Sequence, residues 1–182
     1  RFLGMNGIRV LTVTVSDTRK AKDDVSGDLL AQKLGDAGFA VKRHPPVRDE
    51  LLLIRELVRS ASTQNEADVI VLCGGTGLAP RDVTPEAIEP LFEKRIDGFG
   101  EEFRRRSWGA TSSYRTGEPD GSVGARAMLS RATAGVVSAT IVIAIPGSPG
   151  AVELAAPLLV DMLPHGVEIA TGRHGQHAPH KK

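Results

Sequence analysis

The sequence has little that would tie it to an oxidising compartment, a membrane or a nucleic acid. A single cysteine among 182 residues excludes an intramolecular disulfide framework. No apolar run approaches the roughly 20 residues that a membrane-spanning helix needs. Lysine and arginine total 23 against 22 acidic residues, so nothing indicates a basic surface for nucleic acid. We therefore expect a cytoplasmic protein with neither a membrane nor a nucleic-acid partner.

The standard phosphate-binding fingerprints are also missing, yet a glycine-rich stretch follows a strand pattern. Residues 69–72 are apolar and mostly β-branched, as in a strand buried on both faces of a parallel sheet. Gly74–Gly77 lacks the Lys-Ser or Lys-Thr of a P-loop and the spacing of a dinucleotide fingerprint. Its glycines allow a sharp turn and bring backbone N–H groups close to an anion. A tight turn without a ligand is the alternative, and the adjacent Arg81-Asp82 favours an anion site.

A helix start follows this loop. Thr84 is predicted as the N-cap, Pro85 as the first helical residue and Glu86 as a first-turn acid. Strand, glycine loop and helix start together place backbone donors at the carboxyl edge of a sheet. Ligands with phosphate groups bind at this edge in α/β folds.

Strand and helix patterns alternate along the chain. Strands are predicted at residues 8–15, 39–47, 68–72 and 140–145, and helices before Gly38, over about 49–61, from Thr84, over 101–108, at 125–132 and after Gly150, with a turn at 96–100. This order predicts a three-layer α/β/α sandwich with a mainly parallel sheet. We interpret residues 1–172 as a single domain.

Two polar segments carry no core pattern. Residues 109–124 are rich in Ser, Gly, Pro and Asp and are predicted as a surface insertion, with a lid over the site as the alternative. Residues 173–182 are predicted as a flexible C-terminal tail. Its histidines, His174, His177 and His180, are joined by no carboxylate or cysteine, which favours a solvated tail over a metal site.

Two aspartates are candidates for holding a metal beside the glycine loop. Nucleotidyl transfer needs donors for phosphate oxygens, a divalent metal and carboxylates that fix the metal. Asp82 lies in the loop itself, and Asp49 follows the extended segment 39–47 and opens a helix. The alternatives are that Asp49 caps its helix and that Asp82 only shapes its loop.

Several motifs in one order resemble a known family. They are similar to the signature of molybdenum cofactor biosynthesis protein B and molybdopterin adenylyltransferase, to which the gephyrin G domain is related. These motifs occupy residues 11–19, 24–27, 73–87, 97–101, 130–132 and 146–150.

The resemblance implies a reaction. In this family ATP and Mg²⁺ serve to adenylylate the terminal phosphate of molybdopterin, which gives molybdopterin-AMP and pyrophosphate. Asp49 and Asp82 match the functional aspartates, as catalytic residues and Mg²⁺ ligands. A phosphate nucleophile is already ionised, so the lack of a Ser–His or Cys–His pair agrees with this chemistry. The alternative is a molybdopterin-binding or carrier protein of the same pathway without efficient transfer.

The resemblance also assigns binding positions. The substrate and phosphate side would comprise Gly74, Gly75, Thr76, Gly77, Thr84, Glu86, Ser130, Arg131, Pro146, Gly147, Ser148 and Pro149. The nucleotide side would comprise Ser16, Asp24, Ser26 and Gly27, where helix capping is the alternative for the last three. Arg104–Arg106 are interpreted as a solvated helix face.

The partners that the resemblance implies are molybdopterin, ATP and further copies of the chain. Family members form trimers or hexamers, so a homo-oligomer is implied. Phe99, Phe103 and Trp108 are the apolar candidates for its interface. A protein that inserts molybdenum in the next step is a further candidate partner.

Overall fold

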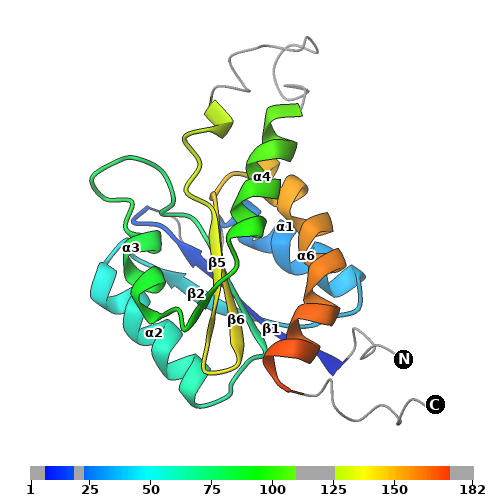
Figure 1. The fold of residues 1–182 in the computed structure, drawn as a ribbon. Helices are drawn as coiled ribbons and strands as arrows, with labels where there is room; N and C mark the ends of the chain where they lie inside the picture. Colours follow the sequence, from blue (N-terminus) through cyan, green and yellow to red (C-terminus); the bar gives the residue numbers. More distant parts are fainter. Residues whose placement is uncertain (1–6, 19–22, 110–125, 173–182) are drawn as a thin grey trace, which may run out of the picture.

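A six-stranded mixed sheet forms the centre of the molecule (Figure 1). The computed structural model describes residues 7–18, 23–109 and 126–172. Strand order across the sheet is β2-β1-β3-β6-β5-β4. The strands are β1 (Arg9–Val15), β2 (Ala40–Val47), β3 (Val69–Cys73), β4 (Lys94–Arg95), β5 (Thr133–Val137) and β6 (Thr140–Ile145). The first four strands in the sheet order run parallel, and β5 and β4 each run antiparallel to the strand before them.

Helices cover both faces of this sheet, which confirms the predicted three-layer α/β fold. The helices are α1 (Val25–Asp36), α2 (Leu51–Thr63), α3 (Thr84–Ile88), the short 3₁₀ helix η3 (Glu89–Leu91), α4 (Asp97–Gly109) and α6 (Pro149–Ala170). One apolar core lies between the sheet and α1, α4 and α6, and a second lies between the sheet and α2 and α3.

The central strand β3 shows how the sequence builds both cores at once. All five of its residues are buried. Successive side chains of a strand point to opposite faces. Val71 therefore joins the core beneath α1, α4 and α6, whereas Ile70 and Leu72 join the core beneath α2. The unbroken apolar run predicted this double burial.

The antiparallel part of the sheet was not predicted. Strand β5 leads through a turn at Ser138-Ala139 into β6, which pairs antiparallel with it, and β4 from earlier in the chain pairs with the other edge of β5. Both turn residues have positive φ, 46° and 67°. Such hairpin turns are usually marked by Asn-Gly or Asp-Gly, so the sequence carried no turn signal here.

Two further local predictions were wrong. Residues 97–100 form the first turn of α4 rather than a separate turn, because Phe99 and Phe103 are buried together one helical turn apart with ring centroids 6.3 Å apart. Only residues 126–127 of the predicted helix at 125–132 are helical among those described, and residues 130–132 run without regular structure into β5.

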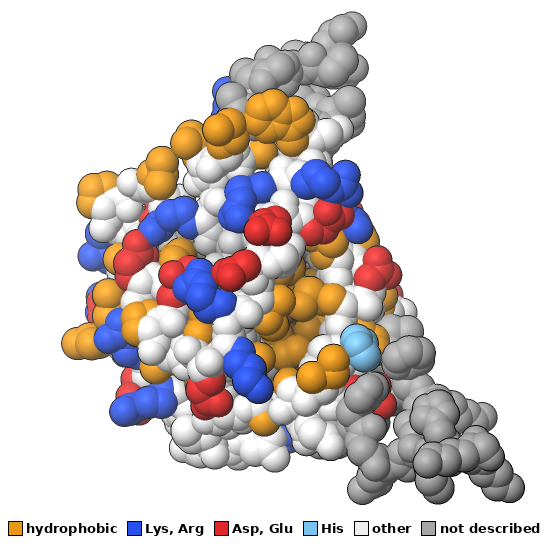
Figure 2. Space-filling view, viewed as in Figure 1, with side chains coloured by type: hydrophobic (Ala, Val, Ile, Leu, Met, Phe, Trp, Pro, Cys, Tyr) orange, Lys and Arg blue, Asp and Glu red, His pale blue; other side chains and the backbone are white. Residues whose placement is uncertain are grey.

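The exposure of the aromatic residues corrects the predicted subunit interface. Phe99 and Phe103 belong to the core, and only Trp108 is exposed. On the face that Figure 2 shows, basic and acidic side chains are interspersed and hydrophobic side chains gather in a hollow beside them. Within the described part of that face, no patch of a single charge sign stands out.

Some predictions concern residues outside the described ranges. Apart from Gly109, which ends α4, the proposed insertion at 109–124 lies there, as does the tail at 173–182 with its histidines. Within the described residues, no helix is both long enough and apolar enough to cross a bilayer.

Candidate functional site

A cavity of about 790 Å³ lies where the parallel strands end. Each of the four parallel strands sends a loop to this edge, which is where the sequence predicted the site. Residues from the strand ends and these loops line the cavity: Val15 at the end of β1, Ser16 and Thr18 after it, Asp49 after β2, Gly74–Leu78 and Asp82 after β3, and Pro146–Pro149 after β6. Arg126, Leu129 and Ser130 complete the lining from the segment before β5.

The glycine loop has its shape because side chains are excluded at two positions. Gly74 and Gly75 have φ values of 124° and 65°, which favour glycine. A Cβ on Gly74 would lie 2.1 Å from the Val15 carbonyl oxygen. A Cβ on Gly75 would lie 2.2 Å from Thr84 Oγ1 and 2.7 Å from Asp49 Oδ1. The loop is therefore packed directly against the strand β1 end and against a candidate site carboxylate.

Backbone donors of this loop differ in their availability. The Gly74 N–H donates to the Ile145 carbonyl at 2.9 Å, so this N–H is not available to an anion, although Gly74 itself lines the cavity. Among the described residues, the N–H groups of Gly75, Thr76 and Gly77 meet no hydrogen-bond acceptor. The three residues line the cavity, and their N–H groups are the donors of this loop that remain for an anion.

Thr84 supports the loop instead of capping its helix. Val83 is the N-cap of α3 and makes no side-chain capping bond. The Thr84 hydroxyl is fully buried and donates to the Gly74 carbonyl at 2.9 Å, and its N–H donates to the Gly75 carbonyl at 3.0 Å. The predicted cap was wrong because Thr84 is already the first residue of α3, and its hydroxyl is used as a donor to the loop carbonyl.

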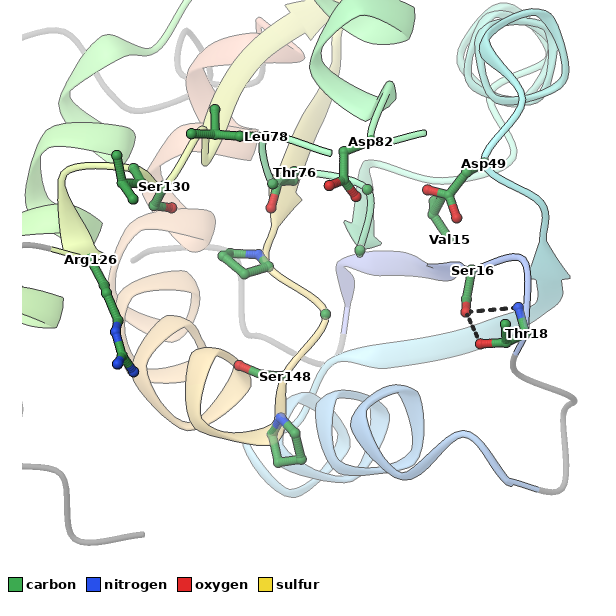
Figure 3. Close-up of a pocket in the computed structure, with 17 residues that line it drawn as sticks. Val15, Ser16, Thr18, Asp49, Thr76, Leu78, Asp82, Arg126, Ser130 and Ser148 are labelled. Carbon is green, nitrogen blue, oxygen red and sulfur yellow. Dashed lines mark hydrogen bonds between the residues drawn. The ribbon is translucent and has the colours of Figure 1, made fainter. Parts of the chain in front are cut away.

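Asp49 and Asp82 lie close together at one end of the cavity (Figure 3). Asp49 does not cap α2, because Glu50 holds that position. Asp49 Oδ1 is buried and has no hydrogen-bond partner among the described residues. Burial raises the pKa of the Asp49 carboxyl above its ordinary value of 3.8, and the charges of Asp17 and Asp82 raise this pKa further. Such a carboxylate is poised to gain from a cation.

Asp82 both shapes its loop and lies in the cavity lining. Its Oδ2 accepts a hydrogen bond from the Ala79 N–H at 3.0 Å, which shapes the loop. The side chain also lines the cavity and contributes to the raised pKa of Asp49. Loop shaping therefore does not remove it from the site.

An ion pair that the sequence analysis did not identify spans the loops after β1 and β3. The Arg81 Nε and Nη2 atoms donate to the Asp17 carboxylate at 2.9 and 2.8 Å. Asp17 also accepts from the Asp49 N–H at 3.2 Å. The hydrogen bond with Arg81 lowers the pKa of Asp17. Asp17 could have been predicted as a site residue because, like Ser16, it comes directly after a buried strand.

The carboxylates of the site fit Mg²⁺ held jointly with a substrate phosphate. Among the described residues no group of three or more His, Cys, Asp or Glu side chains is arranged to hold a metal. Mg²⁺ usually takes only one or two carboxylates together with phosphate oxygens and water. Asp49 supplies the buried oxygen without a partner, and Asp82 supplies a second carboxylate beside it.

The cavity wall opposite these carboxylates is polar and partly basic (Figure 3). Ser148 lies on the cavity edge, where it caps α6 by accepting from the Ala151 N–H at 3.2 Å. Ser130 lines the same wall as predicted, with Arg126 next to it. Arg126 was not identified from the sequence, since it adjoins the segment interpreted as an insertion.

Of the four residues assigned to the nucleotide side, one lines the cavity and three do not. Ser16 lines the cavity. Asp24 is buried away from the cavity, where it caps α1 through the Gly27 N–H and accepts from Arg43 at 2.7 Å. Ser26 donates to the Gly147 carbonyl at 2.9 Å and so fixes the loop before α6. For Asp24 and Gly27, the capping alternative is confirmed.

Arg131 and Glu86 lie behind the cavity rather than in its lining. They line a second cavity of about 500 Å³ on the other side of the residue 130–132 segment. The Arg131 guanidinium is hydrogen-bonded to the carbonyls of Gly77 and Asp82 and paired with Glu86. Neither side chain of the pair lines the larger cavity.

Comparison with known proteins identifies the family. Residues 11–165 match the family model described as "Probable molybdopterin binding domain". The chain belongs to this molybdopterin-binding domain family. It is 41% identical to the molybdenum cofactor biosynthesis protein B of Bacillus subtilis over 161 aligned residues, and this alignment covers 88% of each chain. It is 40% identical over 155 residues to the protein of the same name from Staphylococcus aureus, covering 84% of this chain and 85% of the relative.

Solved structures place the chain among molybdenum cofactor biosynthesis proteins of this family. A crystal structure of molybdenum cofactor biosynthesis protein B matches with a TM-score of 0.79 and 38% identity, covering 91% of this chain and 96% of the other. The tungsten cofactor synthesizing protein MoaB from Pyrococcus furiosus matches with a TM-score of 0.75 and 32% identity, covering 90% and 96%. The family resemblance predicted from the motifs is thereby confirmed.

Proposed function

We propose that this molybdopterin-binding domain adenylylates the terminal phosphate of molybdopterin with Mg²⁺-ATP. The observation that carries the proposal is the buried Oδ1 of Asp49, which lacks a hydrogen-bond partner among the described residues and lies against the glycine loop. An orphaned carboxylate oxygen costs stability unless a cation or donor meets it. Its place beside Asp82 and three N–H groups without acceptors fits a metal-bound phosphate.

In the proposed reaction an oxygen of the molybdopterin phosphate forms a bond to the α-phosphorus of ATP. The bond from that phosphorus to pyrophosphate breaks, and pyrophosphate leaves with the electron pair. The nucleophile is already an anion, so no side chain has to remove a proton. The reaction therefore needs positioned donors and neutralised charge rather than a strong base.

The chain's own residues divide this work by position. Asp49 and Asp82 would hold Mg²⁺, which when bound neutralises charge on the phosphate oxygens. The N–H groups of Gly75, Thr76 and Gly77 would bind and orient the phosphates from the loop. Ser130, Ser148 and Arg126 would contact the molybdopterin side from the opposite wall.

Electrostatics around Asp49 support this arrangement. Desolvation opposes ionisation of Asp49, and the neighbouring charges of Asp17 and Asp82 oppose it further. A divalent cation between the carboxylates would turn that repulsion into attraction. The same acidic cluster would repel ATP without a metal, so it favours binding of ATP as its Mg²⁺ complex.

A turnover assay with Asp82→Asn tests the proposal. Purified protein is incubated with molybdopterin, ATP and Mg²⁺, and molybdopterin-AMP is measured. We expect turnover to fall at least about 100-fold, because Asn keeps the shape of Asp82 but removes its charge, while molybdopterin binding is largely retained. Asp36→Asn, an exposed aspartate at the end of α1, is the control and should leave turnover unchanged.

The outcomes separate two functions. Unchanged turnover in Asp82→Asn would remove this residue from the mechanism. Tight molybdopterin binding without any product in the wild type would favour a molybdopterin-binding or carrier protein of the same pathway. We further propose a homo-oligomer, a trimer or a hexamer, which sedimentation of the full chain would test.

A further inference from the structure

One guanidinium closes the loop that carries Asp82 at both of its ends. Arg131 Nε donates to the Gly77 carbonyl at 3.0 Å, and Arg131 Nη2 donates to the Asp82 carbonyl at 2.9 Å. The remaining Nη1 is paired with the Glu86 carboxylate from α3. All three nitrogens of the fork are thus engaged with the loop or with the helix that follows it.

The loop has few other restraints. Residues 77–81 are exposed and lie outside every helix and strand. Within the loop, Ala79 and Asp82 are joined by two hydrogen bonds. Arg81 forms a solvent-exposed ion pair with Asp17 of the loop after β1. Exposed ion pairs restrain a loop weakly. The half-buried Arg131 is the described side chain that ties both ends of the loop to the body of the domain.

Arg131 is itself held in place from behind. Arg104 of α4 donates to the carbonyls of Ser130 and Ala132 at 3.3 and 3.4 Å, on either side of Arg131. Gly100 lets α4 approach this segment, since a Cβ there would lie 2.6 Å from the Ala132 oxygen. Helix α4 therefore holds the segment 130–132 in place, and Arg131 of this segment in turn holds the loop that carries Asp82.

We infer that Arg131, oriented by Glu86, is a positioning residue that fixes the Asp82 carboxylate for metal and phosphate binding without touching the substrate. The inference rests on the proposed function for its catalytic consequence. Only arginine fits the role, because a planar fork reaches two carbonyls and a carboxylate at once, whereas lysine offers one point charge. This differs from the substrate-binding role that the family resemblance implied for Arg131.

The test compares Arg131→Lys with Arg55→Lys. Arg55 is a matched control, since its Nε and Nη2 also donate to two backbone carbonyls, those of Ala87 and Glu86, but beyond the loop. We expect Arg131→Lys to raise amide hydrogen exchange in residues 77–83 about tenfold. We also expect it to weaken binding of Mn²⁺, used in place of Mg²⁺ with ATP, by a similar factor, and to lower kcat by on the order of 10- to 100-fold with little change in the molybdopterin KM.

Arg55→Lys should leave loop exchange, Mn²⁺ binding and kcat close to wild type. Wild-type exchange at residues 77–83 in Arg131→Lys would overturn the inference. Faster exchange with unchanged Mn²⁺ binding would also overturn it, since Arg131 would then only stabilise the loop. If the wild type makes no molybdopterin-AMP, the proposed function fails, while loop exchange and Mn²⁺ binding still decide the role of Arg131. Should Arg131→Lys not fold, Glu86→Gln is expected to show the same changes at smaller size.

Discussion

At the scale of single residues, Asp49 combines features that are unfavourable for stability and useful for binding a cation. Its Oδ1 is buried without a hydrogen-bond partner among the described residues, and Gly75 must lack a side chain to make room for it. Desolvation and two neighbouring acidic charges raise its pKa. A fold tolerates such a group when function needs it, so Asp49 is where stability and function should oppose each other.

Substituting Asp49 should separate these two properties. Because the pKa of Asp49 is raised on folding, the folded chain binds its proton more tightly, and stability is lost as pH rises from the ordinary value of 3.8 through the raised pKa. Asp49→Asn carries no charge to desolvate, so its free energy of unfolding without Mg²⁺ should exceed that of the wild type at neutral pH, with the gain disappearing below about pH 3.8. Turnover should fall at least about 100-fold.

Urea denaturation at several pH values, without metal, measures this difference. Asp36→Asn at the exposed end of α1 is the control. A loss of stability in Asp49→Asn at neutral pH would mean that the Asp17 backbone hydrogen bond and the Arg81 charge outweigh the desolvation of Asp49, which contradicts the prediction.

At the scale of secondary structure elements, the site depends on a helix that does not touch it. Helix α4 packs on the segment 130–132 through Gly100 and Arg104. In this segment Ser130 lines the cavity, and Arg131 is hydrogen-bonded to the loop that carries Asp82. The first turn of α4 contains two glycines, Gly98 and Gly100. Only Gly100 faces backbone within contact distance, so the two positions should respond differently to a methyl group.

Gly100→Ala should destabilise the protein and disturb the site. A Cβ 2.6 Å from the Ala132 carbonyl oxygen would push α4 away from the segment before β5. Overpacking of this kind costs about 1–3 kcal/mol. Gly98→Ala meets nothing within 4 Å and should be neutral or stabilising by up to about 1 kcal/mol, because alanine favours helix. Thermal denaturation of both variants checks this, and equal effects would show that α4 does not press on residue 132.

At the scale of the whole molecule, the site exists because parallel strands bring four distant loops to one edge. Residues after β1, β2, β3 and β6 surround the cavity of about 790 Å³, and the residue 126–130 segment closes its side. A ligand that contacts all of these loops binds only the folded chain. Ligand binding should therefore stabilise the whole domain, not one loop.

Thermal denaturation with Mg²⁺ and ATP should show this stabilisation. At ligand concentrations about 100-fold above Kd, the gain is about 2.7 kcal/mol, which corresponds to a Tm increase of roughly 5–10 °C for a domain of this size. Asp49→Asn and Asp82→Asn should lose most of the Mg²⁺-dependent part of the increase, whereas Asp36→Asn should keep it. An increase in Tm that is the same with and without Mg²⁺ would argue against the metal site.

The sequence by itself determined the central layers of this protein and the sheet edge at which the cavity lies. Buried strands such as β3 and β6 are visible because burial on both faces leaves an unbroken apolar run, and the glycine loop is visible because only glycine permits its backbone. Both are local properties of the chain. The ordered motifs likewise predicted the family correctly.

Only the tertiary structure decided which way several of the predicted residues face. Thr84 bonds to the glycine loop instead of capping α3, Asp24 is buried beneath Arg43, and Arg131 holds carbonyls of a loop about 50 positions earlier. The β5–β6 hairpin also formed without a turn signal. These features depend on which distant groups meet across the packed layers, and no local periodicity or motif encodes that meeting.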